Sequence, residues 1–357
     1  MSQSADRNHV HAYLNRVAGA HPPHEVHGLF VDWASSQIED GRIRKLFARM
    51  ADRAGIGKRW SVLGEEAYRR SDGLDFYGPD ASISTGARMA VYAREAPLLA
   101  LKAIEGLGPL GTITHVVVAS CTGFVAPGID QILARALGLP GTVERVLIGY
   151  MGCYAGITAL RTARHIVRSE PEARVLVVTV ELCTLHLQPV SDLEKLLAML
   201  QFGDGAAAAI VTAKPEGFEL TDPFALALPE SHDLITWQIG DHGFAMHLSG
   251  EVPGRIADAL ADPAIREVVA GGAATDSWAV HAGGRSILDA VARGLELPED
   301  ALDPSRGVLS DHGNMSSATV LFVLERIMAG GASIADGLAM AFGPGLAVEG
   351  LGYRSAG

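Results

Sequence analysis

The stretch VLIGYMGC, residues 146–153, runs directly into YAGITALRTARHIVR, residues 154–168, and this transition decides the fold. The first part is apolar and typical of a strand, whereas apolar residues after Cys153 recur at helical spacing. Cys153 therefore lies on a predicted strand-to-helix turn, where the helix dipole and unpaired N–H groups favour a thiolate. Small residues on both sides, Gly152 and Gly156, leave room for an acyl group. An isolated cysteine is more often a buried apolar residue, so the interpretation depends on the rest of the chain.

The composition is that of a chain with a large core. Of 357 residues, 48% are hydrophobic and 20% are charged, which is enough for two domains or for two halves of one. No apolar run is long enough for a membrane span and the N-terminus is polar, so we expect a cytoplasmic protein. The net charge of −12 argues against a nucleic-acid surface. Three cysteines without paired spacing indicate neither a disulfide framework nor a zinc site.

Predicted strands and helices alternate along the first half of the chain, which indicates an α/β fold with sheets covered on both faces. The helices are expected at residues 84–106 and 129–137, and the strands at residues 114–119, 174–180 and 207–212. A loop rich in glycine and proline is expected at residues 123–128.

The second half repeats this pattern in shorter form. A strand is expected at residues 278–281 and a helix at residues 287–295. Residues 314–321 resemble residues 204–211, because each segment opens with a polar residue and small residues and continues into an apolar run, so we expect a strand there as well. These similarities predict a tandem pair of similar α/β halves, with chance similarity between buried strands as the alternative.

Five short segments carry a resemblance to a known family. They are GCYAG (152–156), FGDGAA (202–207), HAGG (281–284), GNMSSA (313–318) and GPGL (343–346). With these segments in this order, the chain resembles the type III polyketide synthases, which are chalcone synthase-like enzymes of the thiolase fold. The resemblance implies a five-layer αβαβα fold built from two pseudo-repeated halves. Residues 1–215 are expected to form the half with the nucleophile, and residues 216–357 the half with its histidine and asparagine partners.

The resemblance implies three catalytic residues and a transferase chemistry without cofactor or metal. Cys153 matches the nucleophile that holds the growing chain, and His281 and Asn314 match its partners. A thiolate beside an imidazolium is an activated nucleophile. When a malonyl thioester loses CO₂, negative charge develops on the thioester oxygen, and the N–H groups of His281 and Asn314 are two donors that stabilise it. The substrates implied are malonyl-CoA and an acyl-CoA starter.

Further positions match the substrate cavity of the family. Phe202 matches the aromatic residue that guides the malonyl group, Met246 stands where plant enzymes have a second phenylalanine, and Ser316 matches a cavity serine. A core aromatic and a backbone-bonded serine are the alternatives for Phe202 and Ser316. The other substrate-binding positions implied by the resemblance are Cys121, Thr122, Ala126, Cys183, His186, Gly343, Pro344 and Gly345.

A basic segment at residues 42–59 matches the coenzyme A entrance of the family. Arg49 and Arg53 align with residues that contact the phosphates, and Leu46 replaces a third basic residue, so Lys45 is expected to take its place. The alternative is the solvated face of a helix.

Departures from the plant enzymes predict the substrate. In plant relatives a methionine of the partner subunit enters the cavity at the place of Ala126, so the small residue here should leave space. Small groups at Thr122, Ala126 and Cys183 resemble bacterial alkylpyrone and alkylresorcinol synthases, in which similar positions open a tunnel for a fatty acyl tail. We therefore expect a fatty acyl-CoA starter. A malonyl-only enzyme that makes tetrahydroxynaphthalene or phloroglucinol is the main alternative, because naphthalene-forming members also have a cysteine at the place of Cys121.

Two more distant protein classes share part of this pattern. An initiating ketoacyl synthase uses the same three residue types but condenses onto an acyl carrier protein. A catalytically inactive protein of this fold would serve as a scaffold, and the intact Cys153, His281 and Asn314 argue against it. The resemblance alone also predicts a homodimer.

Overall fold

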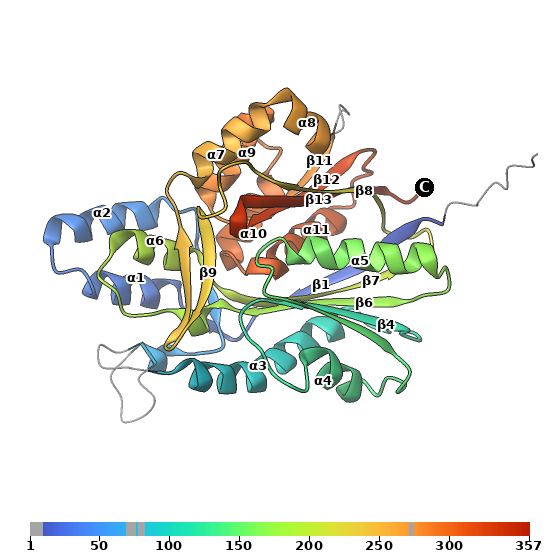
Figure 1. Cartoon of the computed structure of the whole chain (residues 1–357), viewed down its shortest axis with the longest axis horizontal. Coiled ribbons are helices and arrows are strands. Elements are labelled where there is room, and N and C mark those ends of the chain that lie inside the picture. Colours follow the sequence, from blue (N-terminus) through green and yellow to red (C-terminus); the bar gives the residue numbers. More distant parts are fainter. Residues whose placement is uncertain (1–9, 69–75, 78–82, 271–274) are drawn as a thin grey trace, which may run out of the picture.

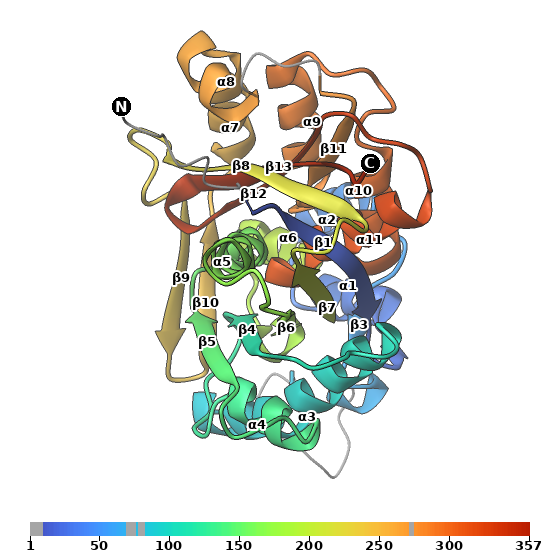
Figure 2. The same ribbon diagram turned by 90° about the vertical axis from the view of Figure 1, so that its right-hand side faces the viewer.

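The computed structural model describes residues 10–68, 76–77, 83–270 and 275–357. Its helices and strands are stacked in five layers that alternate between helices and strands (Figure 1). Figure 2 shows the same stack from the side, with α5 (Ala155–Ser169) in the middle between two groups of strands. The αβαβα arrangement expected from the sequence is therefore confirmed.

The first group of strands combines parallel and antiparallel pairings. Strand β4 (His115–Ser120) pairs in parallel with β5 (Glu144–Gly149) on one side and with β6 (Val175–Leu182) on the other. Strand β7 (Asp204–Thr212) then pairs antiparallel with β6 and with β1 (Ala12–Ala20). Strand β5 is the edge of this group.

The second group lies on the other side of α5. Strand β12 (Gly337–Gly343) pairs in parallel with β11 (Ser277–Val280) and antiparallel with β13 (Ala347–Ser355). Strand β13 in turn pairs antiparallel with β8 (Phe218–Ala227). Because one end of β8 also pairs with β1, hydrogen bonding connects both groups in the order β11-β12-β13-β8-β1-β7-β6-β4-β5.

Helices form the outer and central layers. One outer layer contains α3 (Thr85–Gly106) and α4 (Ile129–Ala136). The central layer contains α5 and α11 (Thr319–Ala329), which contact each other. The opposite outer layer contains α7 (Val252–Ala261), α8 (Pro263–Ala270), α9 (Arg285–Leu295) and α10 (Asp303–His312).

Several elements gather at one end of the layers, on the left of Figure 1. They are the helices α1 (His27–Ser36), α2 (Gly41–Asp52) and α6 (Leu193–Gln201), and a hairpin made of β9 (Ile235–Gly240) and β10 (Gly243–Leu248). Short elements are the strands β2 (His24–Glu25) and β3 (Trp60–Ser61) and the 3₁₀ turns η1 (Glu65–Ala67), η2 (Cys183–His186), η3 (Ser316–Ala318) and η4 (Pro344–Leu346). Within the described residues, no helix has the length and apolar character that a membrane crossing requires.

The strand predicted over residues 314–321 is wrong, while the other predicted elements are present with small shifts at their ends. A 3₁₀ turn at Ser316–Ala318 leads into α11, which is a helix. Its first residues are buried on every side because α11 lies between two groups of strands. A short run of apolar residues has no amphipathic period, so its sequence does not distinguish a buried helix from a buried strand.

The start of α5 touches the segment that precedes α11, and only a glycine allows this contact. A Cβ atom on Gly156 would lie 2.3 Å from the backbone oxygen of Ser317 and 3.0 Å from Cγ1 of Val320. Gly156 lies three residues after Cys153, and Ser317 three residues after Asn314. This contact therefore sets the position of the cysteine turn relative to the asparagine segment.

We expect Gly156→Ala to lower the free energy of unfolding by about 1–3 kcal/mol, because the added methyl group must displace the backbone at Ser317. Gly254→Ala in α7 is the matched control, because a Cβ there would meet no atom within 4 Å. Urea unfolding followed by circular dichroism measures both. Equal stability of the two variants would contradict the proposed contact.

Candidate active site

A cavity that is partly open to solvent lies where the cysteine turn, η2, the β9–β10 hairpin and α6, α7 and α9 meet. The residues predicted for the site that line it are Cys121, Thr122, Cys153, Cys183, His186, Phe202, Met246, His281, Asn314, Ser316, Gly343 and Pro344. The predicted residues that do not line it are Lys45, Arg49, Arg53, Ala126 and Gly345. The cavity therefore collects side chains from segments that are far apart in the sequence.

The turn between β5 and α5 places Cys153 against the segment that follows β12. Tyr150 has φ 59° and Gly152 has φ 86°, so the chain reverses sharply before the cysteine. A Cβ atom on Gly152 would lie 2.4 Å from Cδ of Pro344, and one on Gly343 would lie 3.3 Å from the backbone nitrogen of Cys153. Gly343 and Pro344 thus pack directly on the turn, and Cys153 is almost buried at the cavity wall.

The amide of Asn314 is held from both sides. Its Nδ2 donates to the backbone oxygen of Gly283 at 3.2 Å, and its Oδ1 accepts from the backbone N–H of Ser316 at 2.8 Å. Asn314 and Ser316 also lie beside the thiol of Cys153 and oppose the rise in its pKa that burial causes. The asparagine amide is therefore oriented before any substrate binds.

Phe202 is tied to the same asparagine through the backbone. Gly203 N–H donates to Asn314 O at 3.0 Å, and Asn314 N–H donates to Gln201 O at 2.8 Å. The backbone oxygen of Phe202 accepts from Nη1 of Arg59 at 2.7 Å. Because Arg59 is fully buried, this bond fixes the phenylalanine from behind the cavity.

Burial dominates the charges of Cys153 and His281. Burial raises the pKa of the Cys153 thiol to about 11 and exceeds the opposing effect of its hydrogen bonds. Burial also lowers the pKa of His281 to about 3. Burial therefore opposes the thiolate that the start of α5 is expected to favour. Within the described residues neither ring nitrogen of His281 has a hydrogen-bond partner, so both are available to a substrate or to the thiol.

A buried carboxylate behind the cavity wall was missed by the sequence analysis. Glu181 is fully buried and accepts hydrogen bonds from the backbone N–H of Cys121 at 3.0 Å, from Oγ1 of Thr122 at 2.8 Å and from the hydroxyl of Ser317. Burial raises the pKa of Glu181, although these bonds oppose the effect. Sγ of Cys121 also lies 3.2 Å from Oγ of Ser316. A glutamate inside the apolar strand β6 was the available signal.

Two aromatic side chains that were also missed, Trp237 and Phe244, form one wall of the cavity together with the predicted His186. His186 and Phe244 stack with ring centroids 4.1 Å apart, and Trp237 meets both rings edge-on. Nε1 of Trp237 donates to the backbone oxygen of Cys121 at 3.1 Å. Nε2 of His186 bonds the backbone oxygen of Thr122 at 2.7 Å while Nδ1 accepts from Phe244 N–H at 3.1 Å. Burial lowers the pKa of His186 to about 3, so this histidine is neutral and holds the wall in place.

Two predicted cavity residues lie elsewhere. Ala126 is exposed, and the peptide bond between Ala126 and Pro127 is cis. Gly345 has φ 74° and follows Pro344 in η4, where a Cβ atom would meet nothing within 4 Å. In a single chain, neither residue shapes the cavity.

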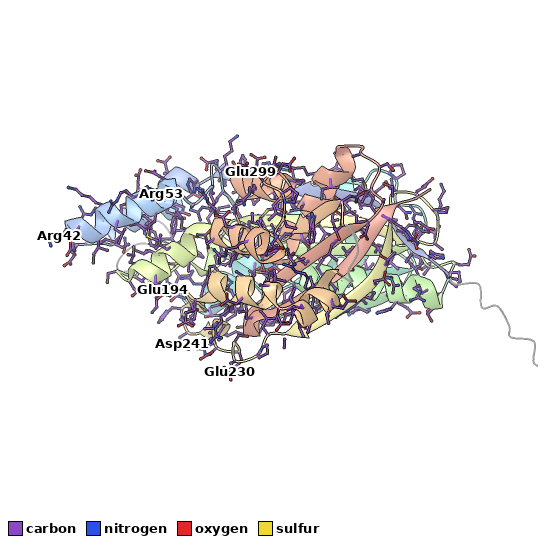
Figure 3. All side chains as sticks on the ribbon, turned by 90° about the horizontal axis from the view of Figure 1, so that it is seen from above. Arg42, Arg53, Glu194, Glu230, Asp241 and Glu299 are labelled. Carbon is purple, nitrogen blue, oxygen red and sulfur yellow. The ribbon has the colours of Figure 1, made fainter. Side chains whose placement is uncertain are left out.

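The predicted coenzyme A residues lie on the exposed face of α2. Lys45, Arg49 and Arg53 are all exposed, and Figure 3 shows Arg53 nearer to the body of the molecule than Arg42. Nη1 of Arg285, the first residue of α9, donates to the backbone oxygen of Arg53 at 3.2 Å. This end of α2 is thereby joined to α9, whose Ile287 lines the cavity together with Lys195 of α6.

Comparison with known proteins identifies the family. The model of chalcone and stilbene synthases, N-terminal domain, matches residues 5–215, and the model of the C-terminal domain matches residues 219–357. PKS-I from the brown alga Ectocarpus siliculosus is 29% identical, with a TM-score of 0.87 over 98% of this chain and 100% of that chain. The C-terminal type III polyketide synthase domain of Steely1, a type I/III hybrid from Dictyostelium, is 25% identical, with a TM-score of 0.88 over 97% of this chain and 100% of that chain.

We expect His281→Ala to move the alkylation of Cys153 to higher pH. With His281 present, the thiol proton can pass to the imidazole, and the two resulting charges stabilise each other. In the variant no imidazole is left to take the proton, so the burial that raises the pKa of Cys153 is no longer offset by an imidazolium, and the thiolate forms only at higher pH. Mass spectrometry of the Cys153 peptide after iodoacetamide treatment at a series of pH values measures the shift.

His247→Ala is the control for this experiment, because His247 is exposed on the same hairpin as the aromatic wall. Its alkylation profile is expected to match the wild type. Identical profiles for the wild type and His281→Ala would contradict the exchange of a proton between Cys153 and His281.

Proposed function

The chain belongs to the chalcone and stilbene synthase family of type III polyketide synthases, and from this membership we propose that it extends a fatty acyl starter on Cys153 with malonyl units. Enzymes of this family are acyltransferases that use coenzyme A thioesters. The observation that carries the proposal is one cavity that brings Cys153, His281 and Asn314 together with a largely apolar wall. Cyclisation of the extended chain would give an alkylpyrone or an alkylresorcinol.

In the proposed mechanism, Cys153 is the nucleophile. Its thiolate attacks the carbonyl carbon of the acyl-CoA, the bond from that carbon to the coenzyme A sulfur breaks, and the leaving thiolate takes the proton from His281. Malonyl-CoA then loses CO₂, and the electron pair of the broken bond forms an enolate. His281 and Asn314 donate hydrogen bonds to the enolate oxygen. The enolate carbon attacks the Cys153 thioester, a carbon–carbon bond forms, and Cys153 leaves as the thiolate.

The apolar wall supports a long acyl tail. Met199, Val252, Ile256 and Ile287 line the part of the cavity between α6, α7 and α9, and Met246 lines it from the hairpin. Burying one methylene group stabilises a complex by about 0.8 kcal/mol, so a wall of this kind favours a longer tail. The tail and the pantetheine arm of coenzyme A must share this space.

The aromatic wall favours the malonyl-only alternative. Trp237, Phe244 and His186 fill the side of the cavity at the hairpin, which leaves less room for a starter near Cys121. A synthase that uses only malonyl-CoA needs no space for an alkyl tail. Tetrahydroxynaphthalene or phloroglucinol would then be the product.

The exposed face of α2 is proposed to bind the donor of the acyl group. Lys45, Arg49 and Arg53 suit the phosphates of coenzyme A. Beside these cations, the apolar side chains of Ile43, Leu46 and Met50 are 39%, 38% and 42% exposed. Large apolar side chains that are exposed in this way favour contact with a protein. An acyl carrier protein, as in an initiating ketoacyl synthase, is therefore the second candidate for the donor of the acyl group. With either donor we propose a cytoplasmic location, which cell fractionation would check.

We expect purified protein with malonyl-CoA and a series of acyl-CoA starters to make products that retain the alkyl tail, and kcat/KM to rise with tail length. Cys153→Ala should abolish every product, because no thioester can form. Liquid chromatography with mass spectrometry identifies the products. Pantetheine thioesters of the same acyl groups should need higher concentrations, because they lack the phosphates proposed to contact α2.

Each contrary outcome of this assay is informative. Products made from malonyl-CoA alone, with no turnover beyond short starters, would replace the fatty acyl proposal by the malonyl-only enzyme. Activity that requires an added acyl carrier protein would support the ketoacyl synthase instead. The absence of any acyl adduct on Cys153 with any thioester would support an inactive scaffold.

The edge strand β5 supports a proposed homodimer. Val146 and Leu147 of β5 are 40% and 46% exposed, and Phe124 nearby is 46% exposed. An unpaired strand edge with apolar side chains is a surface that pairs with another chain. Light scattering should give twice the mass of one chain for the wild type and the mass of one chain for Leu147→Lys. Leu98→Lys is the matched control, since Leu98 is an exposed leucine on α3, and a single-chain mass for the wild type would contradict the dimer.

A further inference from the structure

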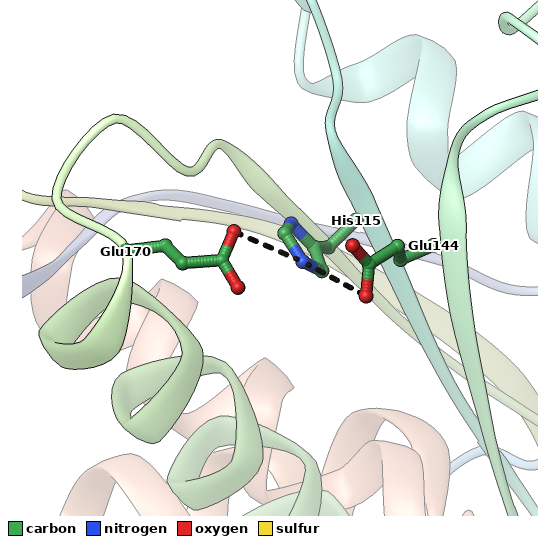
Figure 4. Close-up of side chains that lie close together, drawn as sticks. All are labelled: His115, Glu144 and Glu170. Atoms are coloured by element: carbon green, nitrogen blue, oxygen red, sulfur yellow. Dashed lines mark ion pairs between the residues drawn. The ribbon is translucent and has the colours of Figure 1, made fainter.

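Three side chains that the proposed catalysis does not use meet at the end of α5 that lies away from Cys153 (Figure 4). His115 is the first residue of β4, Glu144 is the first residue of β5, and Glu170 ends α5. Nε2 of His115 lies 3.7 Å from Oε2 of Glu144 and 3.7 Å from Oε2 of Glu170. The three ligand atoms all lie within 4.8 Å of one another.

The imidazole of His115 is buried and fixed in orientation. Its side chain is only 7% exposed, and Nδ1 lies 2.8 Å from Oγ1 of Thr114. The Thr114 hydroxyl accepts from Arg174 N–H at 2.9 Å and lies 3.3 Å from Arg174 O. When the hydroxyl donates to Arg174 O, Nδ1–H donates to the hydroxyl, and the Nε2 lone pair faces the carboxylates. At 3.7 Å, Nε2 makes no hydrogen bond to either carboxylate.

Neighbouring cations are used elsewhere. Arg145 follows Glu144 in the chain, but its Nε pairs with Asp130 at 3.1 Å. The guanidinium of Arg174 donates to the backbone oxygen of Leu110. Across the part of the chain that the structure describes, no lysine or arginine is paired with Glu144 or Glu170. Two carboxylates and a buried imidazole nitrogen thus converge without a positive side chain between them.

We propose that His115, Glu144 and Glu170 bind a divalent first-row transition ion such as Zn²⁺, with water completing the coordination. Zinc binds imidazole nitrogen and carboxylate oxygen at about 2.0–2.2 Å, so two ligands of one ion lie roughly 3–4 Å apart. The separations of 3.7 Å between Nε2 and the two carboxylates fit this range. Thr114 holds the other ring nitrogen, as an outer hydrogen-bond partner of a metal-bound histidine does. One imidazole among the ligands favours zinc over calcium and magnesium.

The backbone at the site is held independently of the ion. Glu144 N–H donates to Thr114 O at 3.0 Å, and Glu170 N–H donates to Ile166 O at 2.8 Å. Glu144 and Glu170 have side chains that are 72% and 56% exposed, so they can rotate toward an ion without moving the strands or the helix. A bound ion would join β4 and β5 to the far end of the helix that begins at the cysteine turn.

The test uses the full chain after removal of metals with a chelator. Zn²⁺ is then titrated in competition with a chromophoric chelator, and bound zinc is measured by mass spectrometry of the metal. We expect the wild type to bind one equivalent of zinc. Glu144→Gln or Glu170→Gln should lower the zinc affinity at least about tenfold. Glu172→Gln, an exposed neighbour outside the cluster, and Cys153→Ala are the controls and should bind zinc as the wild type does.

A second measurement does not depend on the stoichiometry. Zn²⁺ should raise the Tm of the wild type, because an ion that binds the folded state stabilises it. The same addition should leave the Tm of Glu144→Gln and Glu170→Gln unchanged, and Mg²⁺ should shift none of them. No zinc uptake by the wild type, equal uptake by the glutamine variants, or loss of uptake in Cys153→Ala would overturn the proposal.

Discussion

The active-site geometry depends on the contact between the start of α5 and the segment that precedes α11. Both helices lie in the central layer, and each begins beside a residue of the proposed catalytic set. Because Gly156 has no side chain, helix α5 can approach the backbone of Ser317 closely. A Cβ atom on Gly156 would lie only 2.3 Å from Ser317 O. That approach allows Asn314 and Ser316 to reach the thiol of Cys153. Residues from opposite halves of the chain therefore form one site because two helices are buried between two groups of strands.

Burial has opposite consequences for charged and neutral groups around the cavity. It separately disfavours the Cys153 thiolate and the His281 imidazolium, so activation requires that the two charges form together. It keeps His186 neutral, and a neutral imidazole can donate with one nitrogen and accept with the other. Glu181 is different, since several donors surround its carboxylate and offset part of the burial cost. The same dry environment thus gives a reactive pair and a rigid wall.

Local patterns in the sequence predicted local structure, and long-range packing explains what they missed. The strand-to-helix turn at Cys153 follows from the residues around it, and the ends of β5 and α5 agree with that prediction. Helix α11 was mistaken for a strand because its burial between two groups of strands removes the amphipathic period. Trp237 and Phe244 belong to a hairpin whose two strands, within the part of the chain that the structure describes, pair with each other alone, so no local pattern places them beside Cys121 and His186.

The cluster at His115 and the proposed catalytic site share one helix, and this limits how the first can affect the second. Helix α5 has 15 residues, so its ends are about 22 Å apart at 1.5 Å per residue. At that distance the Coulomb interaction is weak, and the carboxylates of Glu144 and Glu170 would offset the charge of a bound ion, so the ion has little direct effect on Cys153. An α-helix packed between two groups of strands moves as a rigid unit. Any influence of the cluster on the thiol must therefore pass through the position and the stability of α5.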